Sequence, residues 1–310
     1  METKESLSRA ERALGLPESR WLDVGGPLHY RQWEGPADGP VCVLVHGLGG
    51  GLLNWALVAP GLAERGRVLA LDLPGFGKTP VAGRGSSIAS CRWVLNGFLR
   101  RLDLAEVVLL GNSMGGMVTL AQAEADPGGV RGLVLANAAL PPKGSPFVGV
   151  PPDVSAGFLV TGTRRLGPAL LRRRTDRLGA ERMVWATLEY VTAHPESLDP
   201  AWVTATIESF QAWVARPGVS AVFSEASRSI VRTYVFARTY RRRLAAIRTP
   251  ALLVHGAADR LVPPANAWRA AREHANWDLV VLPDTGHVPQ VEQPERFLRA
   301  VLPWLDRLPA

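Results

Sequence analysis

Gly111-Asn112-Ser113-Met114-Gly115 is the stretch from which the fold of this chain can be inferred, because of the residues on either side of it. The apolar run at 107–110 predicts a buried strand, and residues 116–123 have the composition of a helix start. A serine in Gly-x-Ser-x-Gly between a strand and a helix is typical of a nucleophile elbow. Because that turn is very tight, a side chain at either flanking glycine would collide with backbone. The turn therefore holds the Ser113 hydroxyl above the sheet, next to free N–H groups of the helix start that favour negative charge.

Strand-like and helix-like segments alternate along the first 140 residues. Strands are predicted at 28–33, 41–45, 68–71, 107–110 and 133–136, with helices at 52–65 and 88–102. The alternation resumes near the C-terminus with strands at 251–254 and 279–282 and helices at 265–273 and 294–305. This order predicts an α/β fold with a mostly parallel, doubly wound sheet that has helices on both faces.

Residues 141–247 interrupt this alternation. They begin with Pro141-Pro142 and Pro151-Pro152, which break helices, and continue in helix-like stretches at 164–174, 180–191, 202–215 and 220–240. We therefore predict a core made of residues 1–140 and 248–310, with residues 141–247 inserted as a helical cap over the sheet.

The amino-acid composition is typical of a globular protein. Of its 310 residues 47% are hydrophobic, which is ample for a core and argues against disorder. No apolar run reaches the roughly 18 residues that a membrane span needs, and the charged residues 1–6 lack the apolar segment of a secretory signal. Cys42 and Cys91 are too few for a disulfide framework, and we expect them to be small core residues. We expect a cytoplasmic protein, and the sequence does not indicate its oligomeric state.

A serine hydroxyl needs a base to take its proton, and two loops after late strands supply candidates. His287 follows the predicted strand at 279–282, and Asp259 follows the one at 251–254, where it could orient the imidazole. Asp284 is the rival acid, but it is so near His287 in sequence that the loop would have to fold back on itself. The order Ser113, Asp259, His287 is the order that the nucleophile-elbow fold uses.

An oxyanion formed at the substrate carbonyl needs two backbone donors. The N–H of Met114 is one candidate, and Leu48 in His46-Gly47-Leu48-Gly49-Gly50-Gly51 supplies the other. We interpret His46 as a residue that organises this loop. No Lys-Ser or Lys-Thr pair follows the glycines, so a nucleotide-binding loop is not indicated. The remaining histidines are interpreted as structural, namely His29, His194 and His274 on regular elements and His255 at a buried strand end.

Five motifs in this order resemble those of the α/β-hydrolase family over about residues 21–305. They are His46-Gly47-Leu48-Gly49, Asp72-Leu73-Pro74-Gly75-Phe76-Gly77, Gly111-Asn112-Ser113-Met114-Gly115-Gly116, His255-Gly256-Ala257-Ala258-Asp259 and Gly286-His287. The resemblance implies hydrolysis through an acyl-enzyme, without cofactor or metal. It also implies a small-molecule acyl ester as substrate and no nucleic-acid partner.

The residue at position 113 restricts the reactions that the chain could catalyse. Relatives that open epoxides or displace halide use aspartate at the elbow, and this chain has serine. Cleavage of a carboxylic ester, as by an esterase, lipase or thioesterase, is the leading interpretation. Carbon–carbon hydrolases of ring-cleavage products often share Gly-Asn-Ser-Met-Gly-Gly, but they usually have tryptophan where this chain has Val288. A cofactor-free haloperoxidase-like activity would use the same triad, and a non-catalytic binding protein is a further alternative.

The cap segment holds large apolar side chains and all of the excess charge. The apolar ones could line an acyl pocket or only hold the cap helices together; they are Trp185, Leu188, Trp202, Phe210 and Trp213. Residues 141–247 contain 15 Lys/Arg against 8 Asp/Glu. The rest of the chain has equal numbers of basic and acidic residues, so the net charge of +7 comes entirely from this segment. Arginines cluster at 164–165, 172–174 and 241–243. These clusters could make a weak contact with an anionic membrane surface, steer an anionic substrate such as an acyl-CoA, or only solvate the surface.

Overall fold

The central strands of the chain are apolar on both faces, as strands buried between two helical layers should be. The computed structural model describes residues 7–144 and 147–308, so the charged stretch at 1–6 lies outside the described residues. Eight strands form one sheet in the order β1-β2-β4-β3-β5-β6-β7-β8. Their bounds are β1 Arg20–Asp23, β2 Pro27–Trp33, β3 Cys42–Val45, β4 Val68–Leu71, β5 Val107–Asn112, β6 Val130–Ala136, β7 Ala251–Gly256 and β8 Trp277–Leu282.

Only β2 runs against the other strands of the sheet. β2 pairs antiparallel with β1 and β4, and every later pair is parallel, from β3–β4 to β7–β8. The predicted mostly parallel, doubly wound α/β sheet is therefore confirmed.

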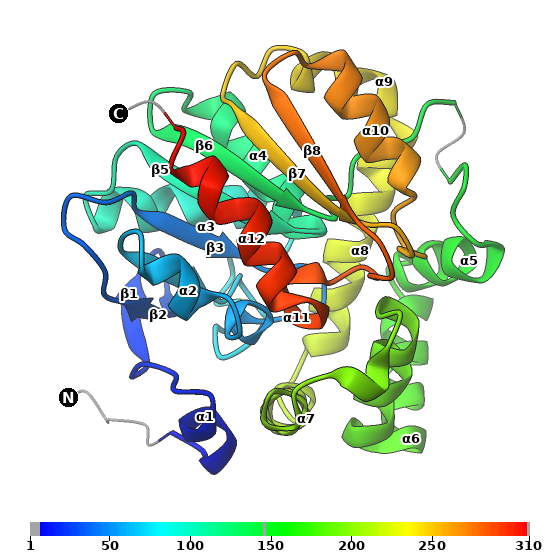
Figure 1. Ribbon diagram of the computed structural model, residues 1–310. Coiled ribbons are helices and arrows are strands. Elements are labelled where there is room, and N and C mark those ends of the chain that lie inside the picture. The colour runs from blue at the N-terminus through cyan, green and yellow to red at the C-terminus, as the bar shows by residue number, and fades with distance from the viewer. Residues whose placement is uncertain (1–6, 145–146, 309–310) are drawn as a thin grey trace.

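Alternate residues of the strands pack into two cores, one on each face of the sheet. In β3, Val43 and Val45 pack with α3 (Ile88–Arg101) and α4 (Met114–Ala125). Cys42 and Leu44 pack on the opposite face with α2 (Ala59–Ala63) and α12 (Pro294–Leu305), which lie in front of the sheet in Figure 1. Cys42 and Cys91 are buried free thiols, and burial raises the pKa of each to about 12.

The segment between β6 and β7 is helical. It comprises α5 (Pro152–Thr161), α6 (Leu166–Val191), the short η2 (Pro195–Ser197), α7 (Pro200–Val214), α8 (Val219–Val235) and α9 (Ala237–Leu244). We call α5–α9 the inserted helices. Figure 1 shows α5, α6 and α7 gathered at one side of the sheet, away from α3 and α4.

Several helix boundaries differ from the sequence predictions. The helix expected at 52–65 is split into η1 (Leu52–Trp55) and α2, and the one expected at 220–240 is split between α8 and α9. Pro151-Pro152 does not prevent a helix, because α5 begins at Pro152, where the missing N–H costs nothing. The expected break between 174 and 180 appears as a single non-helical residue, Gly179, at φ 74° inside α6.

Short elements account for the rest. α1 (Arg9–Ala13), β1 and α11 (Pro289–Glu292) were not expected from the sequence, and each has five residues or fewer.

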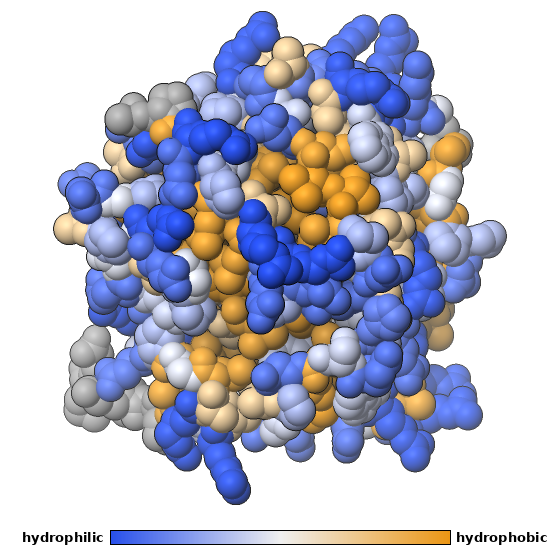
Figure 2. Space-filling view, in the orientation of Figure 1, coloured by the Kyte–Doolittle hydropathy of each residue, from blue (hydrophilic) through white to orange (hydrophobic). Residues whose placement is uncertain are grey.

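Among the described residues, no helix combines the length and apolarity that crossing a membrane requires. Figure 2 shows mostly hydrophilic side chains at the surface, with a hydrophobic patch over β7 and β8 between α12 and α10 (Pro264–Glu273).

Candidate active site

The turn between β5 and α4 holds Ser113 in a conformation that few side chains adopt. Its φ is 54° and its ψ is −115°. A Cβ at Gly111 would lie 2.6 Å from the Gly115 carbonyl oxygen, and one at Gly115 would lie 2.2 Å from that of Val45. Both glycines are therefore required by close backbone approach, as the elbow motif predicts. Strain of this kind persists where the surrounding structure enforces it and is common at functional sites.

His287 and Asp259 form a buried pair. The imidazole Nδ1–H donates to Asp259 Oδ2 at 2.8 Å, and Asp259 Oδ1 accepts from the N–H groups of Leu261 at 2.8 Å and Val262 at 3.0 Å. Burial alone would raise the pKa of Asp259. The His287 charge and the hydrogen bonds from His255 and His287 outweigh that effect and hold this pKa well below its usual range. Asp259 is therefore a carboxylate that fixes the ring with Nε2 free.

Asp284 does not occupy this position. It lies exposed in the turn before His287, with φ at 53°. Aspartate tolerates the left-handed conformation better than most residues, so Asp284 suits this position of the turn.

Asn137 is a residue of this site that the sequence reasoning missed. It follows β6 at φ 44° and is fully buried. Its Nδ2 donates to Asp259 Oδ2 at 2.6 Å and to the Gly286 carbonyl at 3.2 Å, and its Oδ1 accepts from the Gly256 N–H at 3.1 Å. One amide thus joins the ends of β6 and β7 to the loop of His287. The only signal in the sequence was an asparagine directly after an apolar strand.

The loop that carries His287 is held on three sides. The His287 carbonyl accepts from Asn112 Nδ2 at 3.1 Å, and the His287 N–H donates to the Val191 carbonyl at the end of α6 at 2.6 Å. Glu292 accepts from the N–H groups of Gly286 at 2.8 Å and Ala193 at 2.9 Å. The position of the imidazole therefore depends on the inserted helices as well as on the sheet.

His46 organises the loop that follows β3, as expected. Its Nδ1–H donates to the Gly47 carbonyl at 2.7 Å, and its Nε2 accepts from the Leu73 N–H at 2.9 Å. Burial lowers the pKa of His46, which favours the neutral ring that this pair of bonds requires. Within the described part of the chain, the N–H groups of Leu48 and Met114 donate to no protein acceptor, as oxyanion donors should.

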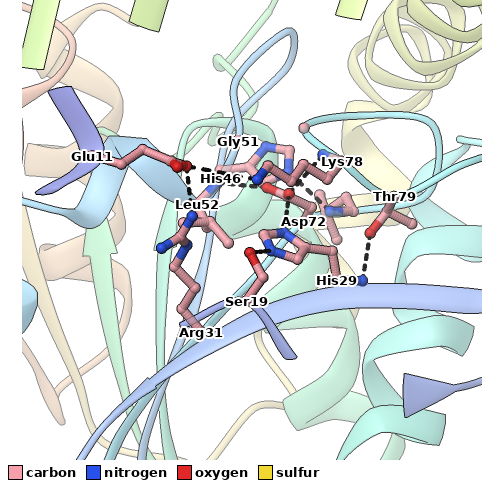
Figure 3. A network of polar contacts seen from close by, with 12 residues as sticks. Glu11, Ser19, His29, Arg31, His46, Gly51, Leu52, Asp72, Lys78 and Thr79 are labelled. Carbon is pink, nitrogen blue, oxygen red and sulfur yellow. Dashed lines mark hydrogen bonds and ion pairs between the residues drawn. The ribbon is translucent and has the colours of Figure 1, made fainter. Parts of the chain in front are cut away.

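A second buried carboxylate, Asp72, fixes the loops beneath this region (Figure 3). Its Oδ1 accepts from the Leu52 N–H at 2.7 Å, and its Oδ2 accepts from the Lys78 N–H at 2.8 Å and from His29 Nδ1 at 2.7 Å. Although burial opposes ionisation, the bond and charge of His29 together with His46 and the Lys78 amide lower the pKa of Asp72 to about 2. His29 therefore has a structural role, as predicted.

The other histidines have structural positions. His255 is buried in β7, where its Nε2 donates to the Val262 carbonyl at 2.9 Å and lies 3.4 Å from Asp259 Oδ2, so it supports the acid. His274 ends α10 and stacks on Trp277. His194 was expected on a regular element, but it lies half-exposed just before η2.

Ser113, His287 and Leu48 line one cavity of about 960 Å³, whose other walls come largely from the inserted helices. Four of the five large apolar side chains predicted for this pocket line it, namely Leu188, Trp202, Phe210 and Trp213. Trp185 does not line the cavity and packs against the core on one face of the sheet, which fits the alternative of a purely structural role. Two of the tryptophans also anchor α7, since Nε1 of Trp202 donates to the Leu53 carbonyl at 2.8 Å and that of Trp213 to the Gly75 carbonyl at 2.6 Å.

The fold and the order of these motifs define a class of protein. The family model described as "alpha/beta hydrolase fold" matches residues 40–294, and the chain belongs to the α/β-hydrolase family. Among solved structures, the chain is similar to wild-type Cfl2 from Burkholderia cenocepacia, with a TM-score of 0.79. The sequences are 23% identical, and the match covers 98% of this chain and 100% of that one, so this likeness shows the fold alone.

Curated relatives of the chain are hydrolases of more than one kind. A 2-hydroxy-6-oxo-2,4-heptadienoate hydrolase of Pseudomonas putida is 31% identical over 86% of this chain and 88% of its own length. A pimeloyl-[acyl-carrier protein] methyl ester esterase of Aeromonas hydrophila is 27% identical over 85% of this chain and 94% of its own length. These similarities support a hydrolase, but they do not decide between hydrolysis of an ester bond and hydrolysis of a carbon–carbon bond.

Proposed function

We propose that this protein is a serine hydrolase that cleaves a carboxylic ester, with Ser113 as nucleophile, His287 as base and Asp259 as the acid that orients it. The observation that carries the proposal is the bond from His287 Nδ1 to Asp259, which leaves Nε2 beside the cavity that Ser113 also lines. In the described residues, His287 Nε2 and the Ser113 hydroxyl form no hydrogen bond, either with each other or with another protein group. Catalytic hydrogen bonds of this kind often form only when substrate is bound.

The proposed reaction has two halves. Ser113 Oγ attacks the substrate carbonyl while its proton passes to His287 Nε2, and the N–H groups of Leu48 and Met114 bind the oxyanion. Collapse of this intermediate breaks the ester bond, and the imidazolium gives its proton to the departing alcohol. Water then attacks the acyl-enzyme, His287 takes its proton, and the acid leaves as Ser113 is restored. No step requires a cofactor or a metal.

The inserted helices are proposed to act as a cap that selects the acyl group. The cavity wall that they form includes the apolar side chains of Leu188, Trp202 and Phe210. Each methylene buried there gains about 0.8 kcal/mol, which is roughly fourfold in kcat/KM. The rate should therefore rise with acyl length until the cavity is full.

Carbon–carbon bond hydrolysis of a ring-cleavage product is the second candidate. A relative at 31% identity carries such a substrate in its name, and the sequence Gly-Asn-Ser-Met-Gly-Gly around Ser113 resembles that class. Val288, which lines the cavity where those enzymes usually have tryptophan, favours the ester instead.

The experiment is a substrate panel assayed with the wild type and Ser113→Ala. It contains p-nitrophenyl esters from acetate to palmitate and 2-hydroxy-6-oxo-2,4-heptadienoate as the carbon–carbon substrate. We expect ester turnover that rises with chain length and is lost in Ser113→Ala. Faster turnover of the ring-cleavage product than of any ester would favour the second candidate. A preference for acetate would contradict the acyl pocket, and turnover of neither class would point to a binding protein.

A further inference from the structure

The corner where α5 meets α6 exposes large apolar side chains to solvent. Leu159 and Val160 at the end of α5 are 49% and 38% exposed, and Leu166 and Leu170 at the start of α6 are 55% and 41% exposed. In Figure 1, α5 lies at the outer edge of the molecule, among the inserted helices. We call these four residues the apolar corner.

The corner lies on the solvent side of both helices. In α5, Ala156, Leu159 and Val160 are spaced three and four residues apart, so they share one face, while Phe158 turns inward to line the cavity. In α6, Leu166 and Leu170 share a face with Arg173 and Arg177, which lie further along the helix. The exposed face of α6 therefore begins as apolar surface and continues as basic surface.

Six exposed arginines surround the apolar corner. They are Arg164, Arg165, Arg172, Arg173, Arg174 and Arg177. Within residues 7–144 and 147–308, none of the six forms an ion pair or a side-chain hydrogen bond. In contrast, Arg243 of α9 forms a bidentate pair with Glu124, and Arg241 donates to the Pro142 carbonyl at 2.7 Å. Asp153 and Asp176 are the exposed carboxylates of α5 and this half of α6, so the positive charge remains in excess.

We propose that the α5–α6 corner docks on an anionic lipid bilayer. Leu159, Val160, Leu166 and Leu170 would enter the boundary between headgroups and acyl chains, and the arginines would bind lipid phosphates. An acidic protein surface would satisfy the arginines, but it would leave four aliphatic side chains without an apolar partner. The corner projects from the fold, which suits insertion into a yielding lipid phase.

Docking at this corner would bring lipid to the wall of the cavity. Phe158, Leu171 and Arg172 lie on the same two helices and line that cavity. The docking surface itself contains neither Ser113 nor His287, so membrane binding does not depend on the proposed reaction. Binding can therefore be measured with the catalytically silent Ser113→Ala protein.

The test is sedimentation of the full chain with vesicles of phosphatidylcholine alone or of phosphatidylcholine with phosphatidylglycerol. We expect binding to the anionic vesicles that weakens as salt rises. The substitutions Arg164→Gln, Arg165→Gln and Arg173→Gln together should lower the partition coefficient by roughly a hundredfold. The pair Leu166→Gln and Leu170→Gln, which leaves the charge unchanged, should lower it by roughly tenfold or more. Thermal unfolding of each variant checks that its fold is intact.

Arg100→Gln with Arg101→Gln is the matched control, because these exposed arginines lie on α3, away from the inserted helices, and should leave binding unchanged. Equal binding to both kinds of vesicle, or binding to neither, would overturn the proposal. Loss of binding with the arginine variants but not with the leucine pair would also overturn it. That outcome would identify a general anion site, suited to an acidic protein or a soluble anion.

Discussion

Asp259 accepts hydrogen bonds at both carboxylate oxygens, and its surroundings decide what it can do. Leu261 and Val262 occupy Oδ1, while Asn137 and His287 share Oδ2. A carboxylate with this many donors stays ionised, so it can hold the His287 ring in one tautomer and stabilise its cation. The bond from Asn137 holds the carboxylate from the end of the neighbouring strand β6.

Replacing Asp259 with asparagine should test its role in orienting the His287 imidazole without disturbing the fold. Asp259→Asn should leave the structure intact and lower kcat for ester cleavage by about ten-thousandfold, because the imidazole takes the wrong tautomer. Asp284→Asn is the matched control, since Asp284 lies exposed in the turn before His287 and should change kcat little. Steady-state kinetics and circular dichroism measure both effects. A larger loss in Asp284→Asn than in Asp259→Asn would contradict the assignment of the acid.

The sequence could predict that Ser113, Asp259 and His287 lie at one edge of the sheet, because each follows a predicted strand and parallel strands bring their carboxyl ends together there. It could not identify Asn137, whose contacts are made with Asp259, Gly256 and Gly286 across two neighbouring strands. No local pattern records such contacts. The role of Trp185 stayed open for a similar reason, since helical spacing alone did not fix which face of α6 meets the cavity.

Asp72 joins three elements that support the site. It connects β2 through His29, the start of η1 through Leu52 and the loop after β4 through Lys78. A side chain at Gly77 would lie 2.1 Å from the Asp72 carboxyl, so the loop closes directly around it. The His46 ring, which shapes the oxyanion loop, bonds to Leu73 next to it.

This network should make stability depend on pH in acid. The pKa of Asp72 falls from 3.8 to about 2 on folding, so its ionised form contributes about 2 kcal/mol. That contribution is present above a pH of about 4 and is lost as the pH falls toward about 2. Asp72→Asn should therefore lower the free energy of unfolding near neutral pH, and its difference from the wild type should shrink over this range.

Urea unfolding of both proteins at several pH values measures that difference. Asp278→Asn, at an exposed position in β8, serves as the control and should follow the wild type. A difference between Asp72→Asn and the wild type that stays constant from neutral pH to about pH 2 would contradict the role of the charge.

Element types were easier to predict than their ends. The helix at 294–305 and the strand at 68–71 match the predictions because apolar spacing and length agree there. The stretch at 52–65 has helical spacing, but the helix is interrupted between η1 and α2. Pro60 lies in the first turn of α2, where its missing N–H costs nothing, but it could not lie inside one continuous helix without losing a hydrogen bond.

The whole molecule combines a sheet that could be predicted with inserted helices that could not be placed in detail. The alternation of strands and helices predicted the order of the elements in the core. The segment that forms α5–α9 contains none of the family motifs, so nothing in the sequence predicted where these helices lie. Their orientation depends on contacts such as Trp213 Nε1 to the Gly75 carbonyl and Glu292 to the Ala193 N–H. These contacts couple the cavity wall to the loop after β4 and to the loop of His287.

The proposed reaction depends on Ser113 as the nucleophile of this cavity. The most direct measurement is labelling with a fluorophosphonate, which loses fluoride as serine Oγ bonds to phosphorus, followed by mass spectrometry of the digested protein. We predict one labelled peptide that contains Ser113, slower labelling in Asp259→Asn and none in Ser113→Ala, which should also lose ester turnover. A label on another residue, or ester turnover that persists in Ser113→Ala, would contradict the account.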